Sequence, residues 1–162
     1  MKRQIFFTQI GGFDTHSAEI GGQGSLLTQV SQAINAFYAA TVELGVQNKV
    51  TTFTMSDFGR TLQPAGSGAG TVGTDHAWGN HQLIVGGAVQ GHTLYGTYPT
   101  LALGGPDDTD GGSNPRGRWI PTTSVEQYAA TLATWYGLST ADLMAVFPLI
   151  DRFPSANLGF LG

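Results

Sequence analysis

The sequence predicts an α/β domain built on a mostly parallel sheet with flanking helices. Residues 5–10 form a short apolar run of β-forming residues that closes at two glycines, which is typical of a buried strand. Apolar residues then recur at helical spacing over residues 27–44, and residues 50–55 alternate β-branched and aromatic side chains. Strand, helix and strand in this order form a βαβ unit, whose strands pair in parallel through a right-handed crossover.

The ends of the predicted first helix follow from capping chemistry. Ser25 is a suitable N-cap, because its hydroxyl can accept a hydrogen bond from a free backbone N–H group of the first turn. Gly45 stands at the position after the helix where a left-handed glycine is favoured. We therefore expect one helix of about 20 residues between the two strands.

The middle of the chain alternates a short strand with loops. Residues 82–89 contain the apolar triplet of a third strand, and residues 93–103 fit a further short strand or hairpin. Residues 104–117 are rich in Gly and Asp, which is typical of an exposed loop. Their aspartates resemble a calcium loop, but Pro106 would occupy the first ligand position and no Glu closes the loop, so an EF-hand is rejected.

Two helices are predicted near the C-terminus. Ser124 and Gln127 resemble a capping box, a pattern that also occurs one residue earlier, and the helix that follows ends at Gly137. Ser139 caps a last short helix, which stops before Pro148 because proline cannot continue it.

Composition excludes several classes of protein. The 162 residues include 7 Lys+Arg and 11 Asp+Glu and show no basic stripe, so nucleic acid is not an expected partner. No apolar run approaches the roughly 18 residues of a membrane-spanning helix, so no membrane contact is expected. The chain has no Cys, which excludes thiolate metal sites and cysteine nucleophiles. We expect one domain over residues 1–162, and a partial one, because its first predicted core strand begins at once.

Acidic and histidine side chains gather around the predicted strand ends. Asp14 and His16 follow the first strand, Asp57 follows the second, and His76 lies in a polar segment just before the third. Ligands of open α/β sheets bind beyond the carboxyl ends of the strands, so these side chains are expected at one edge of the sheet. Asp and His without Cys suit a divalent ion, with zinc expected and manganese or calcium as alternatives.

Each of these residues also has an ordinary structural explanation, as a loop-capping Asp or a hydrogen-bonding His. The convergence of three segments is the observation that favours a metal site. Asp14 and His16 stand two apart, so in extended chain they face the same way and can share one ion. Arg60 either holds an oxyanion or pairs with Asp57, and the sequence does not decide between the two.

Four ordered motifs resemble those of a bacterial protein family. They lie at residues 11–16, 52–61, 73–81 and 116–124. Over essentially its whole length the chain resembles the C-terminal part of the family called domain of unknown function 1501, which looks like a branch of the alkaline phosphatase and sulfatase superfamily. The resemblance implies an alkaline-phosphatase-like α/β fold, of which this chain is the C-terminal half.

The resemblance also implies roles for single residues. Asp14 and His16 match the aspartate and histidine of one metal site, His76 matches the late histidine of that site, and Asp57 matches the aspartate of a second site. Phe58 stands where the superfamily usually has a histidine, which puts the second metal in doubt. The superfamily's nucleophile, a Ser or Thr, comes from an N-terminal segment that we do not expect in this chain.

The implied activity is metal-assisted hydrolysis of a phosphate or sulfate ester, with the ion acting as a Lewis acid. Arg60 or Asn80 would steady the charge that develops on the nonbridging oxygens. Because the nucleophile segment is missing, we expect the chain alone to be inactive. The alternatives are a non-catalytic exported scaffold or binding module and a truncated inactive fragment.

Location and partners follow from the same resemblance. Members of the family often carry export signals, which implies a periplasmic or secreted protein. A missing half would leave a sheet edge and an apolar face exposed. We therefore expect either a partner segment that supplies the missing half or self-association of the chain.

Overall fold

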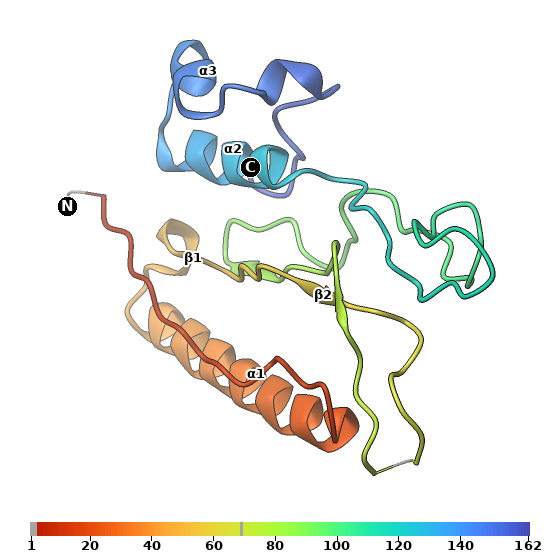
Figure 1. Cartoon of the computed structure of the whole chain (residues 1–162). Coiled ribbons are helices and arrows are strands. Elements are labelled where there is room, and N and C mark those ends of the chain that lie inside the picture. The colour runs from red at the N-terminus through yellow and green to blue at the C-terminus, as the bar shows by residue number, and fades with distance from the viewer. Residues whose placement is uncertain (1–2, 69) are drawn as a thin grey trace.

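The computed structural model describes residues 3–68 and 70–162 and has three helices and four short strands in these ranges. Helix α1 (Glu19–Glu43) lies on one side of the strands, and α2 (Val125–Tyr136) and α3 (Leu143–Val146) lie on the other (Figure 1). The chain is therefore α/β, as predicted. The 3-10 helices are η1 (Gln47–Lys49), η2 (Thr140–Asp142) and η3 (Ile150–Arg152).

The strands form two small antiparallel pairs. Strand β1 (Thr51–Phe53) pairs with β4 (Ile84–Gly86), and β2 (Gly59–Arg60) pairs with β3 (His76–Ala77). These pairs confirm the second and third predicted strands in shortened form. Within residues 3–68 and 70–162 every strand pair is antiparallel, so the prediction of a mostly parallel sheet is wrong.

The first predicted strand does not form. Residues 5–10 run as an extended trace (Figure 1), and no backbone hydrogen bond joins them to another described residue. Ile5, Phe6 and Phe7 are 76%, 81% and 84% exposed. A strand needs a neighbouring backbone to bond, and no described segment provides one here. The predicted βαβ unit is therefore wrong as well.

Residues 93–103 also stay irregular, although they fit a short strand or hairpin. Their carbonyl groups accept hydrogen bonds from side chains of later residues instead of from a strand. Trp119 donates to the Thr100 carbonyl at 3.0 Å, and the Thr122 hydroxyl donates to the Thr97 carbonyl at 2.5 Å.

Helix α1 begins earlier than its sequence predicts. It starts at Glu19, and the predicted cap Ser25 lies inside it. The early start is possible because the N–H group of Glu19 donates to the Val72 carbonyl at 3.1 Å, which replaces a side-chain cap. The helix ends near Gly45, which has the predicted left-handed conformation with φ 67°. No helix in the described ranges has both the length and the apolarity that a membrane crossing needs.

The capping predictions for the C-terminal helices are confirmed. The N–H group of Gln127 donates to the Ser124 hydroxyl at 3.1 Å, and the N–H group of Ser124 donates to Gln127 Oε1 at 3.2 Å. Helix α2 ends at Gly137, which has φ 109°. The Ser139 hydroxyl accepts a hydrogen bond from the N–H group of Asp142, as expected for the cap of the last helical segment.

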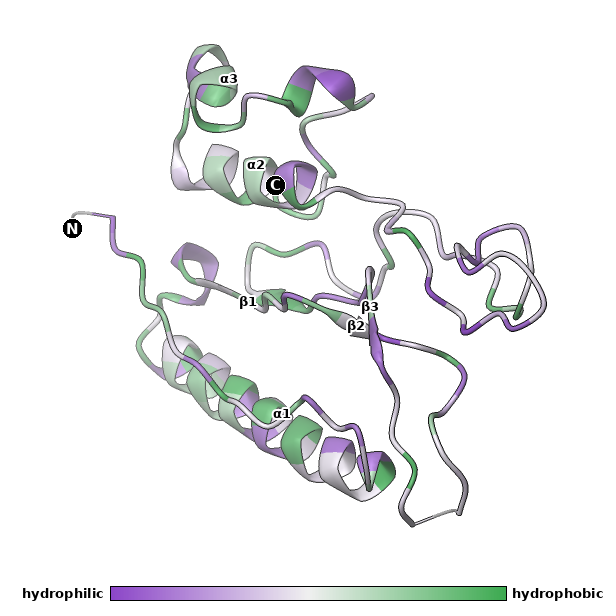
Figure 2. Cartoon of the chain, viewed as in Figure 1, coloured by the Kyte–Doolittle hydropathy of each residue, from purple (hydrophilic) through white to green (hydrophobic). Residues whose placement is uncertain are grey.

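The hydrophobic core lies in the C-terminal part of the chain. Ala130, Leu143 and Ile150 are buried together, between α2, α3 and η3. Helix α1 contributes little to a core, because Thr41 is its only buried residue among those described. Apolar residues on α1, such as Phe37, remain exposed. Figure 2 shows hydrophobic residues along this helix.

The accessible surface is large for the mass of the chain. It is 10760 Å², whereas a compact protein of 17.0 kDa exposes about 7,700 Å². The chain therefore exposes about 3,000 Å² more than a compact protein of its size. Residues 5–10 and α1 carry about a third of the exposed large apolar residues, and the rest are spread along the chain.

Candidate metal centre

Two loops meet where the candidate metal centre lies. Residues 71–74, which lead into β3, form backbone hydrogen bonds with residues 15–19. The Ala18 N–H group donates to the Thr71 carbonyl, and the Thr74 N–H group donates to the Thr15 carbonyl, both at 3.3 Å. This close approach needs a glycine, because a Cβ atom at Gly73 would overlap the backbone of Thr15 and His16. The contact brings His16 beside β3.

Asp14, His16 and His76 converge at this contact. Asp14 Oδ1 lies 2.8 Å from His16 Nε2 and 2.7 Å from His76 Nε2. One ligand atom from each residue lies within 4.8 Å of the others. The three side chains are 57%, 52% and 51% exposed, so a cation can reach them from solvent. One carboxylate and two imidazoles are ligands that zinc commonly takes in open sites, so these residues fit such an ion.

The surroundings of Asp14 favour its charged form. Its hydrogen bond with His76 is the main cause that lowers the pKa of Asp14 below 3.8, and the hydrogen bond from Arg60 acts in the same direction. A carboxylate must be ionised to bind a metal ion. The site therefore holds Asp14 in the state that metal binding requires.

Aromatic stacking fixes the plane of the His76 ring. The Phe58 ring lies parallel to it, with centroids 4.0 Å apart and an interplanar angle of 8°. The His16 ring stacks on His76 as well, at 5.1 Å and 26°. Phe58 thus supplies a packing surface for a candidate ligand.

Arg60 reaches the site but contacts Asp14 and not Asp57. It lies opposite His76 in the β2–β3 pair, and its Nη1 is 3.1 Å from Asp14 Oδ1. Its Nε donates to the Thr74 hydroxyl at 2.9 Å. Several of its donors therefore already have partners within the protein, which makes Arg60 a support for Asp14.

Among the described residues, no hydrogen bond or ion pair joins the side chains of Asn80 and Asp57 to the three grouped residues. The Asn80 amide donates to the Phe58 carbonyl at 2.9 Å, and its oxygen accepts a hydrogen bond from Gln82. Asp57 is exposed, and the group of ligand atoms found in the described ranges does not include it. Within residues 3–68 and 70–162, no cluster of possible metal ligands forms around Asp57, the residue predicted for a second metal site.

Asp75 is a site residue that the sequence pattern does not predict. Its Oδ1 lies 3.4 Å from His16 Nδ1, and its Oδ2 accepts a hydrogen bond from Arg116 at 2.6 Å. The hydrogen bond from Arg116 is the main cause that lowers the pKa of Asp75. Neighbouring residues of a strand point to opposite faces, so the adjacency of Asp75 to His76 does not indicate that both face the same centre.

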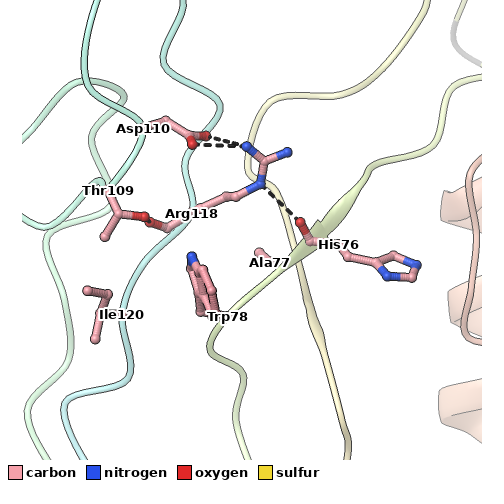
Figure 3. A pocket seen from close by; sticks show the side chains of 7 residues that line it. All are labelled: His76, Ala77, Trp78, Thr109, Asp110, Arg118 and Ile120. Carbon is pink, nitrogen blue, oxygen red and sulfur yellow. Dashed lines mark hydrogen bonds and ion pairs between the residues drawn. The ribbon is translucent and has the colours of Figure 1, made fainter.

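A cavity of about 640 Å³ adjoins β3 away from the ligand atoms (Figure 3). The imidazole of His76 points away from this cavity, so the cavity touches the main chain of His76. Trp78 and Ile120 give it an apolar wall, and the guanidinium of Arg118 pairs with both oxygens of Asp110 at 2.9 and 3.0 Å. The charges in the cavity are thus balanced. Its lining residues are His76, Ala77, Trp78, Thr109, Asp110, Arg118 and Ile120.

Comparison with known proteins identifies a family and no individual relative. No curated protein matches the chain, and no solved structure does. A family model described as "Protein of unknown function (DUF1501)" matches residues 2–109, which include Asp14, His16 and His76. This match covers more than half of the 162 residues, and the chain therefore belongs to the DUF1501 family.

Proposed function

We propose that the chain is the metal-binding part of a hydrolase-like domain that acts on phosphate or sulfate esters. The observation that supports a metal centre is the convergence of Asp14, His16 and His76 from two loops that are far apart in sequence. The ester class rests on the resemblance of the four motifs to the alkaline phosphatase and sulfatase superfamily. An exported location and an alkaline-phosphatase-like parent fold belong to the same proposal.

In this proposal the residues of the site have distinct tasks. A divalent ion, with zinc expected, would supply Lewis-acid chemistry toward an ester oxygen. His16 and His76 would hold it through Nε2 and Asp14 through Oδ1, the atoms that face one another. Arg60 keeps Asp14 ionised and in place through its contact at 3.1 Å. The half-exposed rim leaves room for a substrate larger than the ion.

A non-catalytic binding module is the second candidate, and specific contacts favour it. The amide of Asn80 bonds to the Phe58 carbonyl and the Nε of Arg60 to Thr74, so both residues proposed to steady a transition state are engaged elsewhere. Phe58 also provides no metal ligand at the position where the superfamily has one. Such a module would bind one ion through the same three residues and turn over no ester.

Zinc binding by the purified chain tests the metal centre. After reconstitution and removal of free metal, we expect about one zinc per chain by elemental analysis, because the ligand set suits one ion. His76→Ala and Asp14→Ala should lower the zinc affinity in calorimetry by more than the roughly 100-fold that losing an outer hydrogen-bond partner can cost. Less than about a tenth of an ion in the wild type would overturn the proposal.

His81→Ala is the matched control for the ligand variants. His81 is also exposed and lies near His76 in the chain, but it stacks on Tyr98 and is not part of the group. Its loss should leave zinc affinity unchanged. Hydrolysis of nitrophenyl phosphate and sulfate, measured in the longest polypeptide that carries this chain, separates the two candidates. Zinc-dependent turnover supports the hydrolase, and zinc binding without turnover supports the binding module.

A further inference from the structure

The imidazole of His16 lies between two carboxylates. Its Nε2 is 2.8 Å from Asp14 Oδ1, and its Nδ1 is 3.4 Å from Asp75 Oδ1. Because Asp75 lies against Nδ1, at the other edge of the ring, it is not placed to share a cation with Nε2. The two carboxylates therefore act on different nitrogens of the same ring.

Metal binding requires one form of the neutral His16 imidazole. A neutral imidazole carries its proton on one nitrogen, and the other nitrogen offers a lone pair. Without an ion, Asp14 at 2.8 Å favours a proton on Nε2. An ion bound at Nε2 would replace that proton and leave the ring proton on Nδ1, beside Asp75 at 3.4 Å. Asp75 would thus stabilise the form of His16 that offers Nε2 to the ion.

Asp75 is itself held firmly. Arg116 donates to its Oδ2 at 2.6 Å, and Arg116 is only 25% exposed. The backbone of Asp75 bonds twice to Thr61, which is 3% exposed: the Thr61 N–H group donates to the Asp75 carbonyl at 2.9 Å, and the Asp75 N–H group donates to the Thr61 hydroxyl at 3.1 Å. The carboxylate is therefore fixed through both its side chain and its main chain.

We propose that Asp75 is a positioning residue for the metal centre: held by Arg116 and Thr61, it accepts a hydrogen bond from the Nδ1–H group of His16 and turns Nε2 of His16 toward the ion. This role rests on the proposed metal centre, because it concerns a residue that acts through one of its ligands. It assigns Asp75 and Arg116 to the centre, although neither is a ligand.

Asp75→Asn tests this role, because it removes the charge and keeps the shape of the side chain. Zinc affinity in calorimetry should fall about 10- to 100-fold, as is typical when the hydrogen-bond partner of a ligating histidine is lost. Nitrogen-15 NMR of the zinc-loaded protein should show the His16 Nδ1–H signal shifted, because its carboxylate acceptor has been replaced by an amide. A role limited to folding would lower the melting temperature and leave both readouts unchanged, and that result would overturn the proposal.

Asp110→Asn is the matched control. It weakens a different Asp–Arg pair, with Arg118, and the Asn side chain keeps an oxygen that can accept the hydrogen bond from the Arg116 N–H group. It should leave zinc affinity and the His16 signals as in the wild type. Arg116→Gln is a second variant in case Asp75→Asn does not fold, and it should weaken zinc binding less than Asp75→Asn because the carboxylate remains.

The double variant Asp75→Asn/His16→Ala shows whether Asp75 acts through His16. If it does, the double variant binds zinc as weakly as His16→Ala alone, because the two effects are not additive. Fully additive losses would overturn the proposal while leaving the metal centre itself intact. A wild-type chain that binds no zinc would overturn both, and this is seen before any variant is made.

Discussion

Asp108 organises a whole segment through one carboxylate. Its Oδ1 accepts hydrogen bonds from the N–H groups of Asp110 and Arg118, and its Oδ2 accepts them from Gly104 and Gly117, all at 3.0 to 3.1 Å. A segment that composition predicts only as an exposed loop is thus folded around a single side chain. The segment also carries Arg116 and Arg118, so its order extends to the candidate metal centre and to the neighbouring cavity.

The segment around Asp108 should lose its order in acid. The hydrogen bond from Gly104 is the main cause that lowers the pKa of Asp108 below 3.8. Because the folded-state pKa is the lower one, the carboxylate stabilises the fold above pH 3.8 and loses this effect as pH falls through the lower folded value. We expect amide protection at Gly104 and Gly117 to fall in this range, as measured by hydrogen exchange.

Two variants separate this effect from general acid unfolding. Asp108→Asn should lose the protection of both amides already at neutral pH. Asp107 accepts only one backbone hydrogen bond, from the N–H group of Thr100. Asp107→Asn should therefore keep the protection of the Gly104 and Gly117 amides. Protection that is equal in Asp108→Asn and the wild type at neutral pH would contradict the assignment.

Among the elements, local capping chemistry is predictable and strand pairing is not. Ser124, Gln127 and Gly137 act within a turn of their own helix, so their roles follow from the sequence alone. Strand β1 pairs with β4, although the β2–β3 pair lies between them in the sequence. A short apolar run looks the same in a parallel and in an antiparallel strand, so the sequence does not reveal the direction of pairing. Residues 5–10 have the composition of a strand and lack the neighbour that would make them one.

Ser124→Ala should destabilise the chain through α2. Loss of an N-cap hydroxyl costs about 1 kcal/mol, and α2 contributes Ala130 to the core. For a domain of this size the melting temperature should fall by about 2–4 °C, as measured by circular dichroism. Ser139→Ala, which removes the cap of the three-residue η2, should have a smaller effect. An equal or larger shift for Ser139→Ala would count against this view of α2.

The same distinction applies to the candidate metal centre. Asp14, His16 and His76 could be selected from the sequence because their residue types and motif positions point to metal chemistry. Asp75 could not, because its role depends on a ring of His16 and a guanidinium of Arg116 that only the folded chain brings to it. Contacts between distant segments decide which of the neighbours Asp75 and His76 faces the candidate metal centre. The sequence alone does not show these contacts.

For the molecule as a whole, the exposed apolar surface is the dominant feature. Residues 5–10 have backbone groups without a backbone partner among residues 3–68 and 70–162, together with three strongly exposed apolar side chains, and α1 adds a further apolar surface. The excess of about 3,000 Å² over a compact protein is of the size that stable partners cover in large interfaces. A backbone edge of this kind favours pairing with another strand.

We expect the isolated chain to self-associate through residues 5–10. Sedimentation velocity at micromolar concentrations should show dimers or larger species. Phe6→Glu should reduce them, because it places a charge on the side chain that is 81% exposed. Met144→Glu alters an exposed apolar residue on α3 instead and should leave association unchanged. A monomer at all concentrations, or equal effects of the two variants, would contradict this expectation.

The contact between residues 15–19 and 71–74 has a thermodynamic consequence. Asp14 and His76 are 62 residues apart, so a cation bound by both would cross-link a long loop, and its binding free energy would become folding free energy. At 100 times its dissociation constant, such an ion would raise the free energy of unfolding by about 2.7 kcal/mol. In the N-terminal part of the chain, α1 buries little of its surface. Metal coordination would then stabilise this part of the fold, where hydrophobic packing is sparse.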